Sequence, residues 1–266
     1  MCRDNSFKPK DKVEYLQRYD LDEMEYYNFT YHRIAGTPDW PIVIYDSVEN
    51  RNRSVSAHWG LIPHWTKSKA EGVKSSFKFN DARRETIKEM KLFKPLITKQ
   101  QRCLVPSTGF FEHYHPNPSK KDNIPFIIQL RENHIFSIAG IWTTWKNYED
   151  DSVITSFAMI TTAANELMAN IHNAGPHGQR MPLVLKKEME AQWLDRATPE
   201  NIIDDILNYR VSSEELKAWP VASVRKKHED DECVWAEIPV SNINFAYDRN
   251  LPNGSVNANP QTSLNF

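Results

Sequence analysis

Apolar runs and their periodicity divide most of the chain into strands and short helices. Strands are predicted where short apolar or alternating runs stand between turn residues: Pro41–Tyr45, Val55–Leu61, Arg102–Pro106, Phe126–Leu130, Ile135–Trp142, Ser156–Thr161 and Met181–Leu185, with possible edge strands at Val221–Val224 and Trp235–Val240. Helices are predicted at Ala82–Lys91, Ala163–Asn170, Lys187–Leu194 and Pro199–Leu207. Asp81 is the expected N-cap of the first helix and Thr198 that of the last. The pattern predicts one α+β domain with a β-rich core and short flanking helices.

Composition narrows the class of protein. With 266 residues, of which 40% are hydrophobic, the chain can fill a sizeable core without stabilising disulfide bonds or metal ions. The three cysteines, Cys2, Cys103 and Cys233, lack CxxC spacing, which argues against a disulfide framework and a zinc site. No apolar run is long enough to span a membrane, so we expect a cytoplasmic protein without metal or cofactor. Residues 248–266 are rich in Asn, Pro and Ser and are predicted to form a disordered tail.

Charge alone does not indicate a nucleic-acid ligand. The chain has 33 basic and 35 acidic residues, so any such function needs a local basic patch. One stretch between Lys67 and Lys94 is crowded with lysine and arginine. It predicts either a phosphate-binding surface or simply a solvated helix face.

The first two residues, Met1-Cys2, offer the most distinctive chemistry. The small side chain of Cys2 permits removal of Met1, which leaves an α-amine and a thiol on one residue. These groups have ordinary pKa values of about 8 and about 8.5. The amine can condense with an aldehyde to an imine that the thiol closes into a thiazolidine, or the thiolate can attack a carbonyl. The alternative is an unreactive cysteine on a frayed terminus.

Three internal segments contain candidate acid–base or anion-binding groups. Glu112 stands among aromatic residues, which favour a protonated carboxyl and suit a proton donor. His172 ends a predicted helix ahead of the Gly/Pro loop Gly175–Gly178, where a histidine can exchange protons near neutral pH. The segment Asn80–Thr86 places short polar side chains and guanidinium groups at a predicted helix start, which suits an oxyanion. Each also has a structural interpretation, as a strand end, a structural histidine or a helix cap.

Taken together, the motifs resemble one family, the SOS-response-associated peptidase (SRAP) domain. They arrive in that family's order and cover roughly residues 1–245. The motifs are Met1-Cys2, His58-Trp59-Gly60-Leu61-Ile62-Pro63-His64-Trp65, Asp81-Ala82-Arg83-Arg84-Glu85-Thr86, Phe93-Lys94-Pro95, Arg102-Cys103-Leu104-Val105-Pro106, Gly109-Phe110-Phe111-Glu112, Ala139-Gly140-Ile141-Trp142, Ile171-His172 and Arg180-Met181-Pro182-Leu183-Val184-Leu185. The resemblance implies an SRAP domain over residues 1–247 with a barrel-like β-rich core.

The resemblance also implies an activity. Proteins of this kind capture abasic sites in single-stranded DNA, where the amine of the terminal cysteine attacks the sugar aldehyde and the thiol closes a thiazolidine. The resulting crosslink protects the lesion, and the protein would be nucleoid-associated when bound to DNA. The matching catalytic positions are Cys2, Asn80 or Asp81, Glu112 and His172; the matching DNA-binding positions are Arg3, Trp65, Arg83, Lys91 and Arg180.

Two departures from the family pattern bear on those assignments. The family usually begins Met-Cys-Gly-Arg, whereas Arg3-Asp4 follows Cys2 here. The family's Asn-Ala-Arg motif reads Asp81-Ala82-Arg83, with Asn80 one position earlier, so either residue could take the asparagine's role. A helix cap at Asp81 would favour Asn80 in the site. Alternative functions are a peptidase that uses the same cysteine as acyl nucleophile and a non-catalytic single-strand-binding module; protein partners cannot be inferred from the sequence.

Overall fold

The structure is a computed structural model, and it describes residues 4–23, 30–33, 39–119, 122–175, 179–224, 226, 231–240 and 243–247. Cys2, Arg3 and the predicted tail at 248–266 therefore lie outside the described residues. The strands are β1 (Asp4–Phe7), β2 (Thr30–Arg33), β3 (Asp39–Asp46), β4 (Arg51–Trp59), β5 (Asp81–Arg83), β6 (Arg102–Ser107), β7 (Gly109–Tyr114), β8 (Ile124–Leu130), β9 (Phe136–Lys146), β10 (Val153–Ala163), β11 (Arg180–Pro182), β12 (Val184–Leu185) and β13 (Leu216–Pro220). The α-helices are α1 (Lys12–Tyr19), α2 (Lys69–Ser76), α3 (Lys94–Thr98), α4 (Glu166–Ile171), α5 (Lys187–Leu194) and α6 (Glu200–Asn208), with 3₁₀ turns η1 (Phe77–Phe79) and η2 (Asp231–Val234).

The larger sheet closes on itself. Its strands run in the order β11-β10-β4-β3-β6-β9-β12, and β9 also pairs with β10, so that β3, β4, β6, β9 and β10 form a closed barrel. The pairing of β4 with β10 is parallel, whereas β9 is antiparallel to both β6 and β10. The fold is α+β, with a barrel-like core flanked by short helices, as the sequence and the resemblance predicted.

Close packing of large side chains fills the barrel. Trp40, Trp59 and Phe157 are almost fully buried, with ring centroids 5.9 Å apart for the first pair and 6.1 Å for the second. Gly140 on β9 permits the close approach of β6, because a Cβ there would lie 2.8 Å from Cys103 Sγ. Gly60 ends β4 with φ +127°, a conformation that side chains rarely adopt, and its missing Cβ leaves room for the Ser76 carbonyl.

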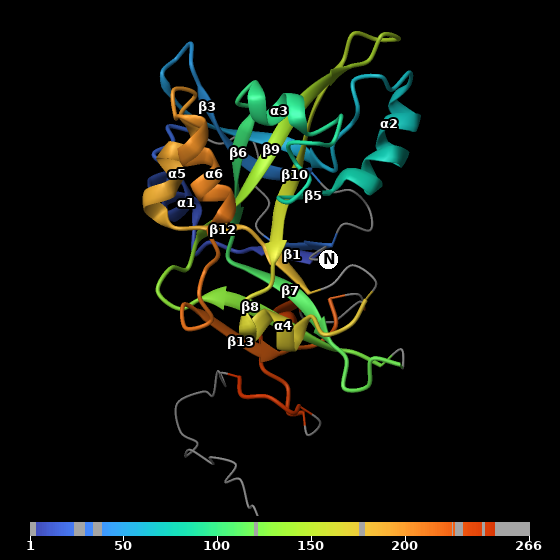
Figure 1. Cartoon of the computed structure of the whole chain (residues 1–266), viewed down its shortest axis with the longest axis vertical. Coiled ribbons are helices and arrows are strands. Elements are labelled where there is room, and N and C mark those ends of the chain that lie inside the picture. The colour runs from blue at the N-terminus through green and yellow to red at the C-terminus, as the bar shows by residue number, and fades with distance from the viewer. Residues whose placement is uncertain are drawn as a thin grey trace, which may run out of the picture.

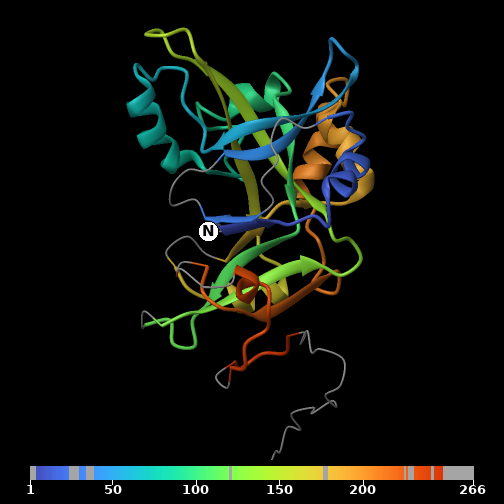
Figure 2. The ribbon, with the colours of Figure 1, turned by 180° about the vertical axis from the view of Figure 1, so that it is seen from behind.

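A second sheet lies beside the barrel, with strand order β13-β8-β7-β1-β2, all antiparallel. Figures 1 and 2 show it below the barrel, with α4 nearby, while α1, α5 and α6 lie on one side of the barrel and α2 on the other. Residues 231–240 and 243–247 contact this sheet: Trp235 Nε1 donates to Ser6 Oγ on β1 at 2.9 Å, and Phe245 packs against Tyr114 on β7. These contacts pack the C-terminal part of the described chain against β1 and β7.

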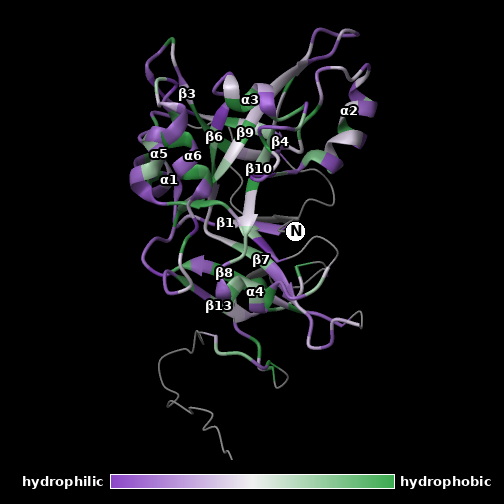
Figure 3. Cartoon of the chain, in the orientation of Figure 1, coloured by the Kyte–Doolittle hydropathy of each residue, from purple (hydrophilic) through white to green (hydrophobic). Residues whose placement is uncertain are grey.

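Hydropathy follows this arrangement. Figure 3 shows that the helices flanking the barrel carry both hydrophilic and hydrophobic residues, as expected for helices that pack one face against a core. Among the described residues, no helix has the length and apolar character needed to cross a membrane.

Several predicted elements are confirmed, and one prediction at the site is wrong. Helix α5 coincides with the predicted Lys187–Leu194. The helix predicted at Ala82–Lys91 is absent: β5 (Asp81–Arg83) pairs in parallel with β10, and turns follow it as far as α3. The free edge of β10 accepts this segment and buries Ile87 beneath it, which outweighs local helix propensity. Asp81 is therefore not a helix cap.

Other differences reflect pairing at a distance. The predicted strand Met181–Leu185 is split at Leu183 into β11, which pairs with β10, and β12, which pairs with β9. The predicted edge strands near Val221 and Trp235 are reduced to an isolated bridge between Val221 and Glu237. Thr198 is not the N-cap of α6, since Pro199 occupies that position without a side-chain bond.

Candidate active site

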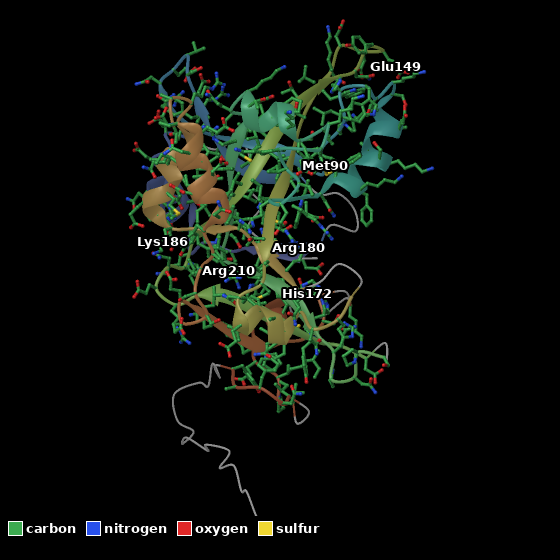
Figure 4. The ribbon with its side chains drawn as sticks, viewed as in Figure 1. Met90, Glu149, His172, Arg180, Lys186 and Arg210 are labelled. Carbon is green, nitrogen blue, oxygen red and sulfur yellow. The ribbon has the colours of Figure 1, made fainter. Side chains whose placement is uncertain are left out.

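The end of β10 brings together segments far apart in the sequence. Arg83 on β5 pairs with Thr161, and Arg180 on β11 pairs with Ala163, so the two arginines belong to strands on opposite sides of β10. His172 is the C-cap of α4. Figure 4 shows Arg180 near the lower end of β10 and His172 below it, between the barrel and the second sheet. The site therefore forms where the two sheets meet.

His172 is held in a fixed position by its own helix and by β11. Asn165 caps α4 through a bond from Met168 N–H to its Oδ1, and His172 N–H donates to Met168 O at 2.7 Å. The Nδ1 atom of His172 lies 3.1 Å from the Arg180 carbonyl oxygen and 3.3 Å from the Arg180 amide nitrogen. A protonated Nδ1 donates to the carbonyl and an unprotonated one accepts from the amide, so the ring is held in either state. This arrangement suits a group that exchanges protons.

Glu112 on β7 approaches the same histidine. Its Oε2 atom lies 3.9 Å from His172 Nδ1, and both side chains are nearly buried. Oε1 accepts a long bond from the His113 amide at 3.4 Å, whereas Oε2 has no hydrogen-bond partner among the described residues. A buried carboxylate oxygen without a donor is costly unless another group reaches it. The pair is thus a candidate proton-transfer couple with unused acceptor capacity.

Arg180 is anchored rather than freely exposed. Its Nη2 donates to Glu85 Oε2 at 2.9 Å and to Thr161 O at 2.7 Å, and its Nε donates to Thr161 Oγ1 at 3.3 Å. Burial opposes the charge on Glu85, but the hydrogen bond from Arg180 and the charges of Arg180 and Arg84 bring the pKa of the Glu85 carboxyl below its usual value. The guanidinium is therefore pre-positioned at the edge of the site by an ionised carboxylate.

Asn80 and Asp81 take different positions at the start of β5. Asn80 is buried, its carbonyl accepts from Trp59 Nε1 at 3.1 Å, and its Nδ2 has no partner among the described residues. Asp81 is half-buried on the face of β5 that it shares with Arg83, and Ala82 on the other face is buried, while Asn80 precedes the strand as the C-cap of the turn η1. The amide, not the carboxylate, is thus buried with unused donor capacity.

The basic stretch separates into paired and unpaired cations. Lys88 Nζ lies 2.7 Å from Glu200 and 2.5 Å from Asp204 on α6, and Arg84 bonds to Asn208 at the end of the same helix. Within the described part of the chain, Arg83 and Lys91 form no ion pair with a carboxylate. The surface available to phosphates is therefore smaller than the sequence indicates.

Trp65 is half-exposed, at 52%, and its ring is edge-on to His64 with centroids 4.8 Å apart. His172 lies 3.9 Å from Glu112 and hydrogen-bonds to the backbone of Arg180, and β10 links Arg180 to Arg83. No contact among the described residues joins Trp65 or Lys91 to that group. The positions of Cys2 and Arg3 lie outside the described residues.

Sequence reasoning missed the structural roles of two residues here. Thr161 binds Arg180 through both its hydroxyl and its carbonyl, and Glu85 forms an ion pair with it. Glu85 belongs to a family motif, but the sequence does not show that it lies beside Arg180, which is 95 residues away along the chain. Thr161 lies in an apolar run that predicts only a strand. No group of three or more His, Cys, Asp or Glu side chains within the described ranges is placed to hold a metal ion.

Comparison with known proteins relates most of the chain to one family. The family model for the SOS response associated peptidase (SRAP) matches residues 1–227. The abasic site processing protein YoqW of Bacillus subtilis is 31% identical over 217 residues, covering 79% of this chain and 87% of that protein. The abasic site processing protein HMCES of Xenopus tropicalis is 26% identical over 197 residues, covering 68% of this chain and 56% of that protein. A crystal structure of a protein from Bacteroides thetaiotaomicron superposes with a TM-score of 0.69 at 29% identity, covering 88% of this chain and 98% of that one.

Proposed function

Because the chain belongs to the SOS response associated peptidase (SRAP) family, we propose that it processes abasic sites in single-stranded DNA by covalent capture through Cys2. The observation that carries this proposal is the buried Glu112–His172 pair beside the strand that follows Cys2. Asp4 is directly opposite Phe111, the neighbour of Glu112, in the β1–β7 register. Two residues of chain reach at most about 7 Å, so chain connectivity keeps Cys2 within that distance of the start of β1.

The other cysteines are poor candidates for the nucleophile. Cys103 is fully buried in the barrel, and burial raises the pKa of its thiol well above the ordinary value. A thiol in that state is neither ionised nor accessible to a DNA sugar. Cys233 follows the second sheet in the 3₁₀ turn η2, on the face opposite Glu112. Cys2, with an amine and a thiol on one residue, remains the best candidate.

The proposed reaction needs no oxidant or cofactor. The Cys2 amine adds to the C1′ aldehyde of the opened sugar, the carbonyl oxygen takes a proton, and water leaves to give the imine. The thiol sulfur then adds to the imine carbon, and the nitrogen regains a proton as the thiazolidine ring closes. In this scheme His172 and Glu112 transfer the protons during sugar opening and imine formation, and the Asn80 amide orients the terminal residue or the sugar.

The DNA strand is held by a small set of side chains. Arg83, Lys91 and the anchored Arg180 bind phosphates, and Trp65 stacks on a base, which is the usual combination for single-strand binding. Arg3 would add a further cation next to Cys2. The half-exposed Trp65 and the absence of carboxylate partners for Arg83 and Lys91 within the described part of the chain support this assignment.

The direct test uses the mature protein and an oligonucleotide with one abasic site. We expect a denaturant-resistant complex whose intact mass equals protein plus DNA minus one water. Cys2→Ser should lose the stable adduct while retaining a reducible imine, and a protein that keeps Met1 should form neither. An intact strand is the matched control. Full crosslinking by the Met1-retaining protein, or peptide cleavage with no DNA adduct, would overturn the proposal, and equal binding of intact and abasic strands without any adduct would indicate a binding module.

A further inference from the structure

Asn5 on β1 carries a buried side-chain amide that has no role in the proposed proton transfers. Its side chain is fully buried, and its Oδ1 accepts a hydrogen bond from Ser107 Oγ at 2.7 Å. Ser107 Oγ in turn accepts from the Gly109 amide at 3.1 Å, which orients the hydroxyl toward Asn5. The Nδ2 group of Asn5 has no hydrogen-bond partner among the described residues. Burying an amide donor without a partner lowers the stability of the fold, and a bound ligand that accepts from the amide would offset that cost.

The strand register places Asn5 and Glu112 on the same face of the second sheet. Asn5 is directly opposite Phe110 in the β1–β7 pair, and Glu112 follows Phe110 by two residues on the same face. Phe7 and Phe110, which share this face, both belong to the main core, whereas Phe111 belongs to the cluster on the other face. Asn5 and Glu112 are therefore diagonal neighbours that face inward from adjacent strands.

Their unsatisfied atoms are complementary. Asn5 Nδ2 is a donor and Glu112 Oε2 is an acceptor, yet each lacks a partner within the described part of the chain, so they do not bond to each other. Diagonal neighbours on paired strands are about 7–8 Å apart at Cα, so a third polar group placed between the two side chains could satisfy both atoms. A hydroxyl can accept from the amide and donate to the carboxylate at the same time, which neither a carbonyl nor an ammonium can do.

We propose that Asn5 is a substrate-binding residue, and that its Nδ2 donates to the C4′ hydroxyl that appears when the abasic sugar opens. Opening breaks the bond between C1′ and O4′, moves a proton to O4′ and leaves the C1′ aldehyde. Asn5 and Glu112 then hold the new hydroxyl between them and prevent the ring from reclosing while the Cys2 amine attacks. This inference rests on the proposed function and adds a substrate contact to it.

The test compares Asn5→Leu with wild type by single-turnover crosslinking. Leucine has a similar size and no polar atom, so it removes the donor and also the unsatisfied group. We expect the rate to fall about ten- to hundredfold, the loss typical of an unpaired hydrogen bond in a buried site. The melting temperature should change little, because Ser107 Oγ loses Asn5 as an acceptor but can donate to the Gly109 carbonyl at 3.1 Å. The dissociation constant for a strand with a tetrahydrofuran analogue, which has no hydroxyl to release, should not change.

Ser6→Ala provides the matched control. Ser6 is the next residue on β1, is equally buried, and bonds to Thr108 and Trp235 on the opposite face. It should lower the melting temperature with little effect on the crosslinking rate. If Asn5→Leu fails to fold, Asn5→Ser keeps a hydroxyl for Ser107 but is too short to reach the sugar, and it should be equally slow.

The outcomes separate this inference from the proposed function. Failure of the wild-type protein to form an adduct would contradict the proposed function itself. Wild-type protein that forms the adduct, together with Asn5→Leu or Asn5→Ser at the wild-type rate, would overturn only the role of Asn5. Slow crosslinking by Asn5→Leu together with an equal loss of affinity for the tetrahydrofuran strand would likewise contradict a contact made only after ring opening.

Discussion

Two buried polar regions of this protein differ in how completely their groups are paired. Between α1 and α5, Arg18 donates to Glu190 at 2.8 and 2.6 Å and to Ile135 O at 3.1 Å, and the Tyr19 hydroxyl lies 3.0 Å from Ser137 Oγ. At the candidate site, by contrast, single atoms of Asn5, Asn80 and Glu112 have no partner among the described residues. Most side chains of both regions are buried, and only Arg18, at 17%, is partly exposed, so exposure does not account for the difference.

The contrast separates a structural role from a binding role. A paired network satisfies its own desolvation cost and fixes the position of one element against another. Buried groups that remain unpaired reduce stability, and they persist where a ligand completes the hydrogen bonds. The α1–α5 network therefore positions helices on the barrel, whereas the site retains capacity for a substrate. Three measurements test this distinction.

The largest effect is expected from breaking the paired network. Glu190→Ala leaves the Arg18 guanidinium, whose side chain is 17% exposed, without its carboxylate. Because water reaches part of this side chain, the free energy of unfolding should fall by about 2–3 kcal/mol, less than the roughly 3–5 kcal/mol of a fully buried pair. Denaturant unfolding measures this loss, while the crosslinking rate per folded molecule should not change. The double variant Arg18→Met with Glu190→Leu should recover much of the stability, because an apolar pair leaves no unpaired charge. A loss under about 1 kcal/mol for Glu190→Ala would mean that the network is not structural.

An intermediate effect is expected at the unpaired site. Glu112→Gln keeps the side-chain shape and removes a proton acceptor, and His172→Ala removes the ring beside it. Each should slow single-turnover crosslinking by about ten- to thousandfold, as expected for loss of a general acid–base group. Strand affinity should remain nearly unchanged. The rate is compared per folded molecule, because His172→Ala also removes the hydrogen bonds between the ring and the Arg180 backbone and lowers the free energy of unfolding. A large loss of DNA affinity at an unchanged rate would instead make these two residues binding groups.

The smallest effect is expected from the cations, and it depends on whether they are already paired. Arg83→Ala should weaken DNA binding and reduce the slope of log K against log salt by about 0.7, since one phosphate contact and its counterion are lost. Lys88→Ala is the matched control, because Glu200 and Asp204 already neutralise Lys88, and its slope should equal that of wild type. Titration of DNA binding at several salt concentrations gives both slopes. Equal slopes for all three proteins would exclude Arg83 from the phosphate-binding surface.

Local patterns predicted elements whose environment is set by nearby sequence. The β-branched and aromatic runs indicated β3, β6, β8, β9 and β10, because a strand buried on one or both faces carries its signal in its own residues. The segment after Asn80 was predicted wrongly, since its helical spacing could not reveal that the edge of β10 was available for pairing. The short strand β1 was also missed, because four residues next to a terminus carry little periodicity.

At the candidate site, the residue types could be read from the chain, whereas their arrangement depends on the assembled fold. Motifs identified Glu112, His172 and Arg180 and the family that contains them, because side-chain identity is a property of the chain alone. That His172 lies 3.9 Å from Glu112, that Glu85 holds Arg180, and that Asn80 rather than Asp81 is buried follow only from how β5, β7, β11 and α4 assemble around β10. Pairing between strands distant in sequence depends on edges and faces that no local pattern encodes, and that pairing determines which polar atoms remain available to a substrate.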